Sequence, residues 1–264
     1  MNLLLLQENW KMAAARYILL GIIVCLLSSP GHLLNAERHT MWFHDRSYDN
    51  LLPLYPTMTS SFVTTSEFQC ARSCKDDVTC NSFFYNDVSK TCAPQWLVFV
   101  SPWNTTEGHN WRYYRFSTAS CPRGASYVID RVSMTCYRPV TSPKLTWTAA
   151  RDTCRDNGEE LTVLEPVAKA HFVTSFLYAN NDTEQQLYIG GSRPHSTWNT
   201  TNADFVWLTG QQVDITALQA YKNPAFPASN DRKNVLVVSP AKQTFHNAGD
   251  AWERAYICER PLSV

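Results

Sequence analysis

The chain has 264 residues, which suits one large domain or two small ones. Its 23 Lys and Arg balance 23 Asp and Glu, and this zero net charge argues against a nucleic-acid coat or a polybasic membrane surface. A hydrophobic content of 44% excludes a disordered chain, and 14 prolines against 9 glycines exclude a collagen-like architecture.

The N-terminal segment has the residue order of a secretory signal. Basic residues precede an apolar run of 11 residues at 17–27, and small or turn-forming residues follow it. This predicts a signal peptide over residues 1–36, cut after Gly31 or Ala36, and the first two methionines are both candidate starts. The apolar run is shorter than the ~20 residues that span a bilayer, which favours cleavage over a signal anchor.

We therefore expect a secreted, extracellular protein with no membrane span in the mature chain. Three N-x-Ser/Thr sequons occur, at Asn104, Asn181 and Asn199. In a secreted chain they predict a glycoprotein, with these segments at the surface.

Cysteines indicate two domains. Removal of the signal also removes Cys25, and an even number in an oxidising compartment indicates four disulfides. The two groups, 70–92 and 121–258, are separated by a polar stretch with a linker at 118–120. If each group pairs within itself, about nine connectivities remain of about 105. The eight cysteines are Cys70, Cys74, Cys80, Cys92, Cys121, Cys136, Cys154 and Cys258.

The first cysteine group begins on a predicted helix. Ser66 is a candidate N-cap, and Cys70 and Cys74, four residues apart, share one helix face. A strand-like run follows at 80–85, and a closing strand is predicted at 111–116. This order is typical of a helix stapled to a small antiparallel sheet.

Over residues 41–117 the chain resembles the PAN/apple family, whose core reads C-x3-C, then C-x-S/A-F-x-Y, then C. The resemblance implies a nested pairing of Cys70 with Cys92 and of Cys74 with Cys80. Many apple domains have an extra cysteine pair that closes the termini. This chain lacks it, so we expect looser ends.

The second group begins with a predicted hairpin at 121–136. Trp147, Ala150 and Cys154 then share one face of a predicted helix, which Gly158 is placed to end. A second helix is predicted at 166–177, with Pro in its first turn. Strand-like runs follow at 187–191, 205–210, 235–238 and 252–259.

Residues 121–262 resemble the C-type lectin-like domain. The motifs are Tyr188-Ile189-Gly190-Gly191 at its W-I-G-L, Trp207-Leu208-Thr209-Gly210 at its W-x-x-G, and Tyr256-Ile257-Cys258-Glu259 at its closing F/Y-I-C-E. The resemblance implies the pairs Cys121–Cys136 and Cys154–Cys258. The expected fold class is α+β: a disulfide-stapled PAN/apple-like domain, then a C-type lectin-like fold with two helices, antiparallel sheets and a long loop region.

Calcium-binding relatives supply oxygens from an E-P-N or Q-P-D triplet, a downstream Glu and a W-N-D triplet. Here Phe245-His246-Asn247 falls at W-N-D, and Asn223-Pro224-Ala225 is the best match to E-P-N. The alternative, Phe226-Pro227-Ala228, has no oxygen-bearing side chain at either end. With so few carboxylates, no cofactor is expected and Ca²⁺ is disfavoured. The resemblance also implies a cis bond before Pro224.

The long loop also lacks the second disulfide of the family. Asn234 and Asp250 occupy the two cysteine positions, so we expect a less constrained loop. Candidate ligand-binding residues there are Asn223, Pro224, Asn230 and Asn247. The alternative is a divergent calcium site that uses Asn223, Asn230, Asp231 or Asn247.

Catalysis is not expected, because neither a zinc motif such as H-E-x-x-H nor a G-x-S-x-G nucleophile motif occurs. The resulting hypothesis is a secreted, lectin-like recognition protein that binds an extracellular glycan or protein, and no nucleic acid, without the standard calcium site. Two alternatives are a structural, matrix or adhesion component that acts through protein contacts, and a divergent calcium-dependent lectin.

Overall fold

The fold is taken from a computed structural model of the chain. The residues it describes are 41–54, 60–102, 105–118, 120–121, 127–180, 185–193, 205–226 and 233–262. Outside them lie the predicted signal peptide, the sequons at Asn104, Asn181 and Asn199, and Asn230.

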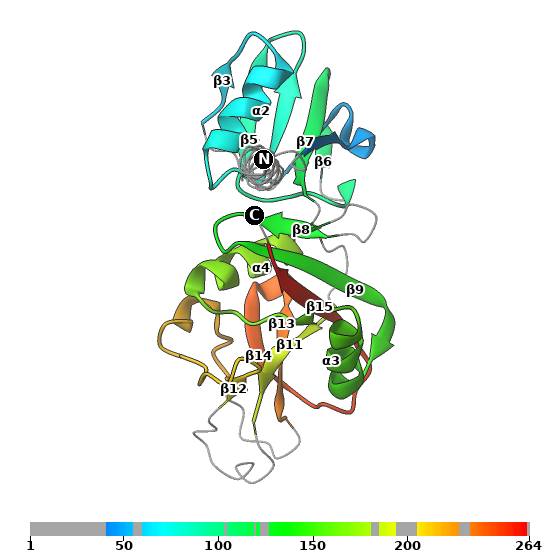
Figure 1. Cartoon of the computed structure of the whole chain (residues 1–264), viewed down its shortest axis with the longest axis vertical. Coiled ribbons are helices and arrows are strands. Elements are labelled where there is room, and N and C mark those ends of the chain that lie inside the picture. Colours follow the sequence, from blue (N-terminus) through cyan, green and yellow to red (C-terminus); the bar gives the residue numbers. More distant parts are fainter. Residues whose placement is uncertain are drawn as a thin grey trace, which may run out of the picture. The chain divides into compact units, whose positions relative to one another are not determined.

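The N-terminal half contains a five-stranded antiparallel sheet in the order β1-β7-β4-β5-β3 and one helix (Figure 1). Strands β2 and β6 form a separate two-stranded ribbon, and a short 3₁₀ helix precedes β2. The bounds are β1 (Met41–His44), 3₁₀ (Arg46–Tyr48), β2 (Leu51–Pro53), β3 (Phe62–Val63), α2 (Glu67–Asp76), β4 (Ser82–Asn86), β5 (Thr91–Gln95), β6 (Thr105–Glu107) and β7 (Trp111–Ser117).

Helix α2 begins where the sequence predicts. The Ser66 side chain accepts a hydrogen bond from the Gln69 backbone N–H, which satisfies one of the unpaired donors of the first turn. Cys70 and Cys74 lie on its buried face. Disulfides join Cys70 to Cys92 on β5 and Cys74 to Cys80 just after the helix. They are the two pairs that the PAN resemblance implies, and they hold the helix against the sheet.

The C-terminal half is built on an eight-stranded sheet in the order β14-β13-β11-β15-β9-β8, with β10 paired to β15 and β12 to β11. The sheet is antiparallel except for the parallel pair β11–β15. The bounds are β8 (Val128–Asp130), β9 (Thr135–Leu145), α3 (Trp147–Asp156), β10 (Glu160–Leu161), α4 (Val167–Asn180), β11 (Leu187–Ser192), β12 (Val206–Trp207), 3₁₀ (Gln219–Tyr221), β13 (Val235–Ser239), 3₁₀ (Pro240–Lys242), β14 (Thr244–Ala248) and β15 (Arg254–Pro261).

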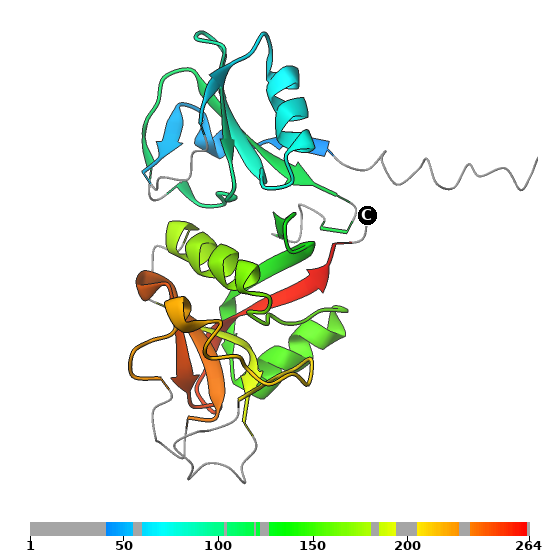
Figure 2. The same ribbon diagram turned by 90° about the vertical axis from the view of Figure 1, so that its left-hand side faces the viewer.

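The two ends of this half are tied together. Strands β9 and β15 pair along most of their length and lie side by side in Figure 2. Two disulfides reinforce the arrangement. Cys121 is bonded to Cys136 at the first hairpin, and Cys154 of α3 is bonded to Cys258 of β15. These are the pairs that the C-type lectin resemblance implies.

Local sequence explains both helices. The Thr146 side chain caps α3 by accepting from the Ala149 N–H, and Gly158, with φ of +68°, follows its end. Helix α4 begins at Val167, one residue later than predicted, and continues to Asn180. Most of its residues are buried, so packing rather than amphipathic patterning holds it in place.

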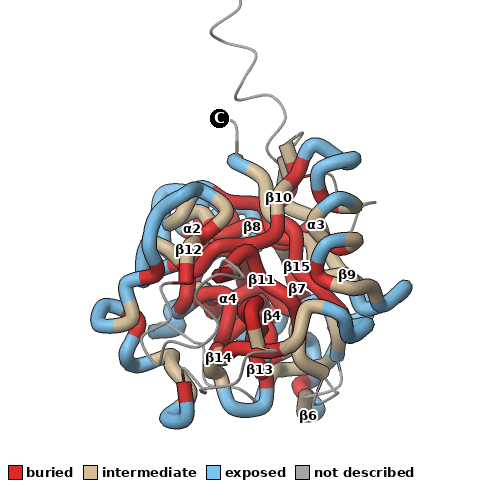
Figure 3. The backbone as a smooth tube through the Cα atoms, turned by 90° about the horizontal axis from the view of Figure 1, so that it is seen from below, coloured by how far each residue is buried: buried red, intermediate tan, exposed pale blue. Residues whose placement is uncertain are grey.

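The core of the C-terminal half lies around the central strands β11, β13 and β15, which are mostly buried (Figure 3). A Cβ at Gly190 would lie 2.5 Å from the Leu161 carbonyl oxygen, so this strand crossing requires glycine. The carboxylate of Glu159 is fully buried and is bonded by Arg138 and by the Tyr127 hydroxyl. This network satisfies a charge that would otherwise be costly to bury.

Arg131, in the turn between β8 and β9, contacts the N-terminal half. Its backbone N–H donates to Asn81 Oδ1 (3.0 Å), and its guanidinium lies at the C-terminal end of α2, where a cation is favoured by the helix dipole. The guanidinium donates, over 2.6–2.9 Å, to the carbonyl oxygens of Cys74, Lys75, Asp77 and Cys80. One side chain therefore satisfies four backbone acceptors across the two halves.

Candidate functional site

The turn that carries Asn223 and Pro224 lies against β14. The Asn223 N–H donates to the Phe245 carbonyl (3.0 Å), and Asn223 Oδ1 accepts from the Ala225 N–H (2.9 Å). The Phe226 N–H then closes the turn on the Asn223 carbonyl (2.9 Å). The bond before Pro224 is not among the cis bonds, so the expected cis isomer is wrong: the turn closes with a trans bond.

Strand β14 holds the three residues aligned with the W-N-D triplet. Phe245 is buried in the core and makes an edge contact with Phe226. Asn247 is buried, and its Nδ2 donates to the Lys233 carbonyl (3.2 Å). His246 is half-buried and lies between them on the strand, so it points to the opposite face. His246 and Asn247 therefore do not converge on one point.

Asn234 and Asp250, at the positions where the resemblance predicts the family's second disulfide, contact each other. Asn234 Nδ2 donates to Asp250 Oδ2 over 2.8 Å. Backbone hydrogen bonds hold both residues: the Trp147 N–H donates to the Asp250 carbonyl (3.0 Å), and the Arg193 N–H to the Asn234 carbonyl (2.9 Å). A side-chain hydrogen bond thus takes the place of the covalent link.

The surroundings of His246 are cationic. Burial, and after it the positive charges of three nearby side chains, lower the pKa of His246 to about 4. These side chains are Arg254, Lys233 and Lys242. A site with this field is unfavourable for a second cation such as Ca²⁺.

An exposed tryptophan lies before the last strand. The Trp252 side chain is 62% exposed, and the Arg254 guanidinium lies 4.9 Å from the centre of its ring. The same guanidinium lies 5.9 Å from the ring centre of Tyr188, and its Nη1 donates to Gln186 Oε1 (2.5 Å). Trp252 and Arg254 are two residues apart, and this spacing ahead of the closing strand is the sequence signal that could have identified them.

Comparison with known families identifies both halves. The family model described as the lectin C-type domain matches residues 143–260, and the PAN domain model matches residues 49–115. The chain contains a PAN domain followed by a C-type lectin domain. None of the curated protein sequences compared with the chain matches it.

Solved structures similar to this chain include human lithostathine, which is 20% identical with a TM-score of 0.43 and covers 53% of this chain and 90% of its own. The carbohydrate-recognition domain of mouse scavenger receptor C-type lectin is 14% identical, with a TM-score of 0.39 and coverage of 49% and 92%. A calcium-independent type II antifreeze protein is 17% identical, with a TM-score of 0.40 and coverage of 53% and 94%.

The described candidate ligands of the C-type lectin domain do not form a group that could hold a calcium ion. Among the described residues there is no cluster of three or more His, Cys, Asp or Glu side chains that could hold a metal. The amide groups of Asn223 and Asn247 bond to nearby backbone groups, and the charges that act on His246 are positive. Ca²⁺ takes six to eight oxygen ligands, and the candidates Asn230 and Asp231 lie outside the described residues.

The predicted ligand-binding residues differ in their accessibility. Pro224 is exposed, Asn223 is half-buried and Asn247 is buried. No helix in the part of the chain that the structure describes is long and apolar enough to cross a bilayer.

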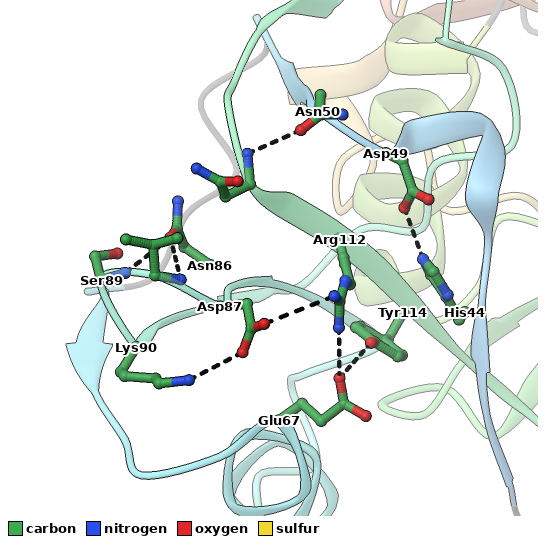
Figure 4. A network of polar contacts seen from close by, with 12 residues as sticks. His44, Asp49, Asn50, Glu67, Asn86, Asp87, Ser89, Lys90, Arg112 and Tyr114 are labelled. Carbon is green, nitrogen blue, oxygen red and sulfur yellow. Dashed lines mark hydrogen bonds and ion pairs between the residues drawn. The ribbon is translucent and has the colours of Figure 1, made fainter.

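On the PAN domain, one face presents a connected set of charges (Figure 4). Arg112 lies between Glu67 (3.5 Å) and Asp87 (3.7 Å), and Lys90 pairs with Asp87 at 3.0 Å. The Tyr114 hydroxyl donates to Glu67 (2.6 Å), and its pKa is raised first by burial and then by this carboxylate. Because the charges oppose one another in pairs, the face has no strong field of one sign.

A groove of about 360 Å³ lies beside the Arg131 turn. Trp96 and His171 stack on one wall at 4.6 Å. Its polar side chains are already bonded: Asn81 Nδ2 to the Trp96 carbonyl, and Asp130 Oδ1 to the Val132 N–H. The groove therefore offers few unsatisfied groups, and it is a weaker candidate than the Trp252 region. Its lining residues are Thr79, Asn81, Trp96, Asp130, Val132, Ala168, His171 and Phe172.

Proposed function

We propose that the chain is a secreted recognition protein whose C-type lectin domain binds an extracellular glycan or protein without calcium. The presence of a PAN and a C-type lectin domain supports a binding role over catalysis. The signal sequence, the four disulfides and the sequons at Asn104, Asn181 and Asn199 support secretion and glycosylation.

The proposal of calcium-independent binding rests on the positions of two β14 side chains. In this strand Asn247 is bonded to the Lys233 carbonyl, and His246 points to the other face into a cationic environment. The first contact fixes the orientation of the Asn247 amide, and a calcium ion beside His246 would be repelled by the surrounding cations.

The test is a glycan array and an extracellular pull-down with the secreted, glycosylated chain, each with Ca²⁺ and with a chelator. The expected result is binding of equal strength in both buffers. Binding abolished by the chelator would overturn the proposal and favour the divergent calcium-dependent lectin. If only matrix proteins are captured, at equal strength in both buffers, the adhesion alternative is favoured within the same calcium-independent class.

A further inference from the structure

A further candidate surface lies where the segment 249–254 runs along the side of the sheet that carries His246; the Tyr188 and Val237 side chains on that side are buried. Tyr188, Val237 and His246 are laterally aligned on β11, β13 and β14. Cross-strand partners share a sheet face, so all three point to the same side. Here "basic face" refers to His246, the segment 249–254 beside it, and the flanking Lys233 and Lys242.

The segment 249–254 is anchored to this face through one hydroxyl. The Tyr188 hydroxyl lies 2.7 Å from the Gly249 carbonyl oxygen and 2.6 Å from that of Trp252. These contacts fix the backbone of Trp252 while its ring is left 62% exposed. The ring itself is contacted by the Arg254 guanidinium at 4.9 Å, and a ring held in this way loses less side-chain entropy when a ligand stacks on it.

Arg254 contacts the Trp252 ring and is also one of the cations near His246. Its guanidinium lies within 6 Å of the rings of both Trp252 and Tyr188 and is oriented by Gln186. The charges of Arg254, Lys233 and Lys242 all reach His246.

Two carboxylates lie in the same segment. Asp250 accepts a hydrogen bond from Asn234, and Glu253 is exposed. Three cations against these two carboxylates leave the face with a net positive charge. An aromatic platform beside a fixed guanidinium matches a ring-shaped ligand that carries a negative charge.

We propose that the basic face binds an acidic sugar, with the sugar ring on Trp252 and its carboxylate or sulfate directed to Arg254 and Lys242. This inference rests on the calcium-independent recognition proposed above and assigns a chemical class to its ligand. It also gives the cationic field around His246 a function, because the field that repels Ca²⁺ attracts an anion.

The experiment measures binding of the secreted full chain, in chelator, to four probes: a sulfated oligosaccharide, its desulfated form, a sialylated oligosaccharide and its asialo form. Binding is expected to the charged member of at least one pair, about tenfold or more above its neutral form, and to weaken as salt is raised. The two pairs distinguish sulfate from carboxylate as the source of the charge.

Two variants locate the site. Trp252→Ala is expected to reduce affinity for the charged probe by about tenfold or more, as an aromatic anchor would. Lys242→Glu reverses an exposed charge on the β13–β14 turn. It is expected to weaken binding of the charged probe and to leave the fold intact. Arg72→Glu, an exposed change on α2 of the PAN domain, is the matched control and is expected to have no effect.

Three outcomes would overturn this inference. They are equal binding of charged and neutral probes, binding of the charged probe unchanged by both variants, and no binding of either charged probe. Neutral-sugar binding that survives chelation would remove the inference and leave the proposed function in place. Binding that requires Ca²⁺ would remove the proposed function as well.

Discussion

The C-type lectin domain is closed in two places by two different kinds of bond. At one, a buried disulfide joins Cys154 of α3 to Cys258 of β15. At the other, a hydrogen bond joins Asn234 to Asp250, next to the β13–β14 hairpin. The first closes a loop with a sequence separation of 104, whereas the second lies between residues 16 apart. The comparison suggests that the short closure at Asn234 and Asp250 can be made by a hydrogen bond, whereas the long closure at Cys154 and Cys258 is made by a disulfide.

The hairpin is held by other interactions, which explains why a hydrogen bond is sufficient there. All five residues of β13 are buried and pair in unbroken register with β14. Phe245 also packs against Phe226 of the preceding turn. Helix α3 forms no backbone ladder with the sheet, so the Cys154–Cys258 disulfide contributes more to holding the helix against β15.

Removal of the Cys154–Cys258 disulfide is expected to have the largest effect. The chain-entropy model gives about 4.7 kcal/mol for a loop of about 100 residues, so the double variant Cys154→Ala, Cys258→Ala is expected to lose about that much stability. Denaturant unfolding of the secreted protein measures the loss. The control is Cys121→Ala, Cys136→Ala, which opens a loop with a separation of 15 and is expected to lose about 3 kcal/mol. Equal losses would contradict the loop-length argument.

The next largest effect on stability is expected from the buried carboxylate of Glu159, which lies near the Cys154–Cys258 disulfide. Glu159 is fully buried against Arg138, so Glu159→Gln leaves a buried cation without its partner and is expected to cost about 3 kcal/mol. The neighbouring pair Arg155–Glu160 is partly exposed, and Glu160→Gln is expected to cost less than about 1 kcal/mol. Similar losses in the two variants would show that the burial of Glu159 does not matter.

A smaller effect is expected at the hydrogen-bonded closure. Asp250→Ala removes one side-chain hydrogen bond and is expected to cost about 1 kcal/mol. Asn234→Cys with Asp250→Cys is expected to form a disulfide, seen by peptide mapping without reduction, and to raise the unfolding midpoint above that of the wild type. A double variant that stays reduced under oxidising conditions would mean that the two positions are not equivalent to the family's cysteine pair.

The sequence predicted the parts of the molecule that depend on local signals. Ser66 was identified as a cap from its position before a helical pattern, and the structure shows its hydrogen bond to the Gln69 N–H. The signature at 188–191 lies on β11, and that at 256–259 lies on β15. Such features are readable because each depends on a few neighbouring residues.

Features built from residues distant in sequence were not predicted. The four carbonyl contacts of Arg131 join a turn to a helix more than 50 residues away, and the stack of Arg254 on Tyr188 joins two strands. The sequence marks Asn234 and Asp250 as positions of a missing disulfide, but it does not predict the hydrogen bond between them. Each of these contacts depends on tertiary packing, which residue spacing does not encode.

The one effect that appears only at acidic pH concerns His246, next to the hydrogen-bonded closure. Burial and the cations around it lower its pKa to about 4, below the usual 6.5, so the folded chain holds this imidazole neutral. Its contribution to stability is complete above pH 6.5 and is lost as the pH falls towards 4, because only the unfolded state takes up the proton over that range. NMR titration of the imidazole is expected to give a pKa near 4, and Lys242→Glu is expected to raise it by removing one repelling charge. His246→Gln is expected to abolish this part of the pH dependence of unfolding. A wild-type pKa near 6.5 would show that neither burial nor the nearby cations act on His246 in this way.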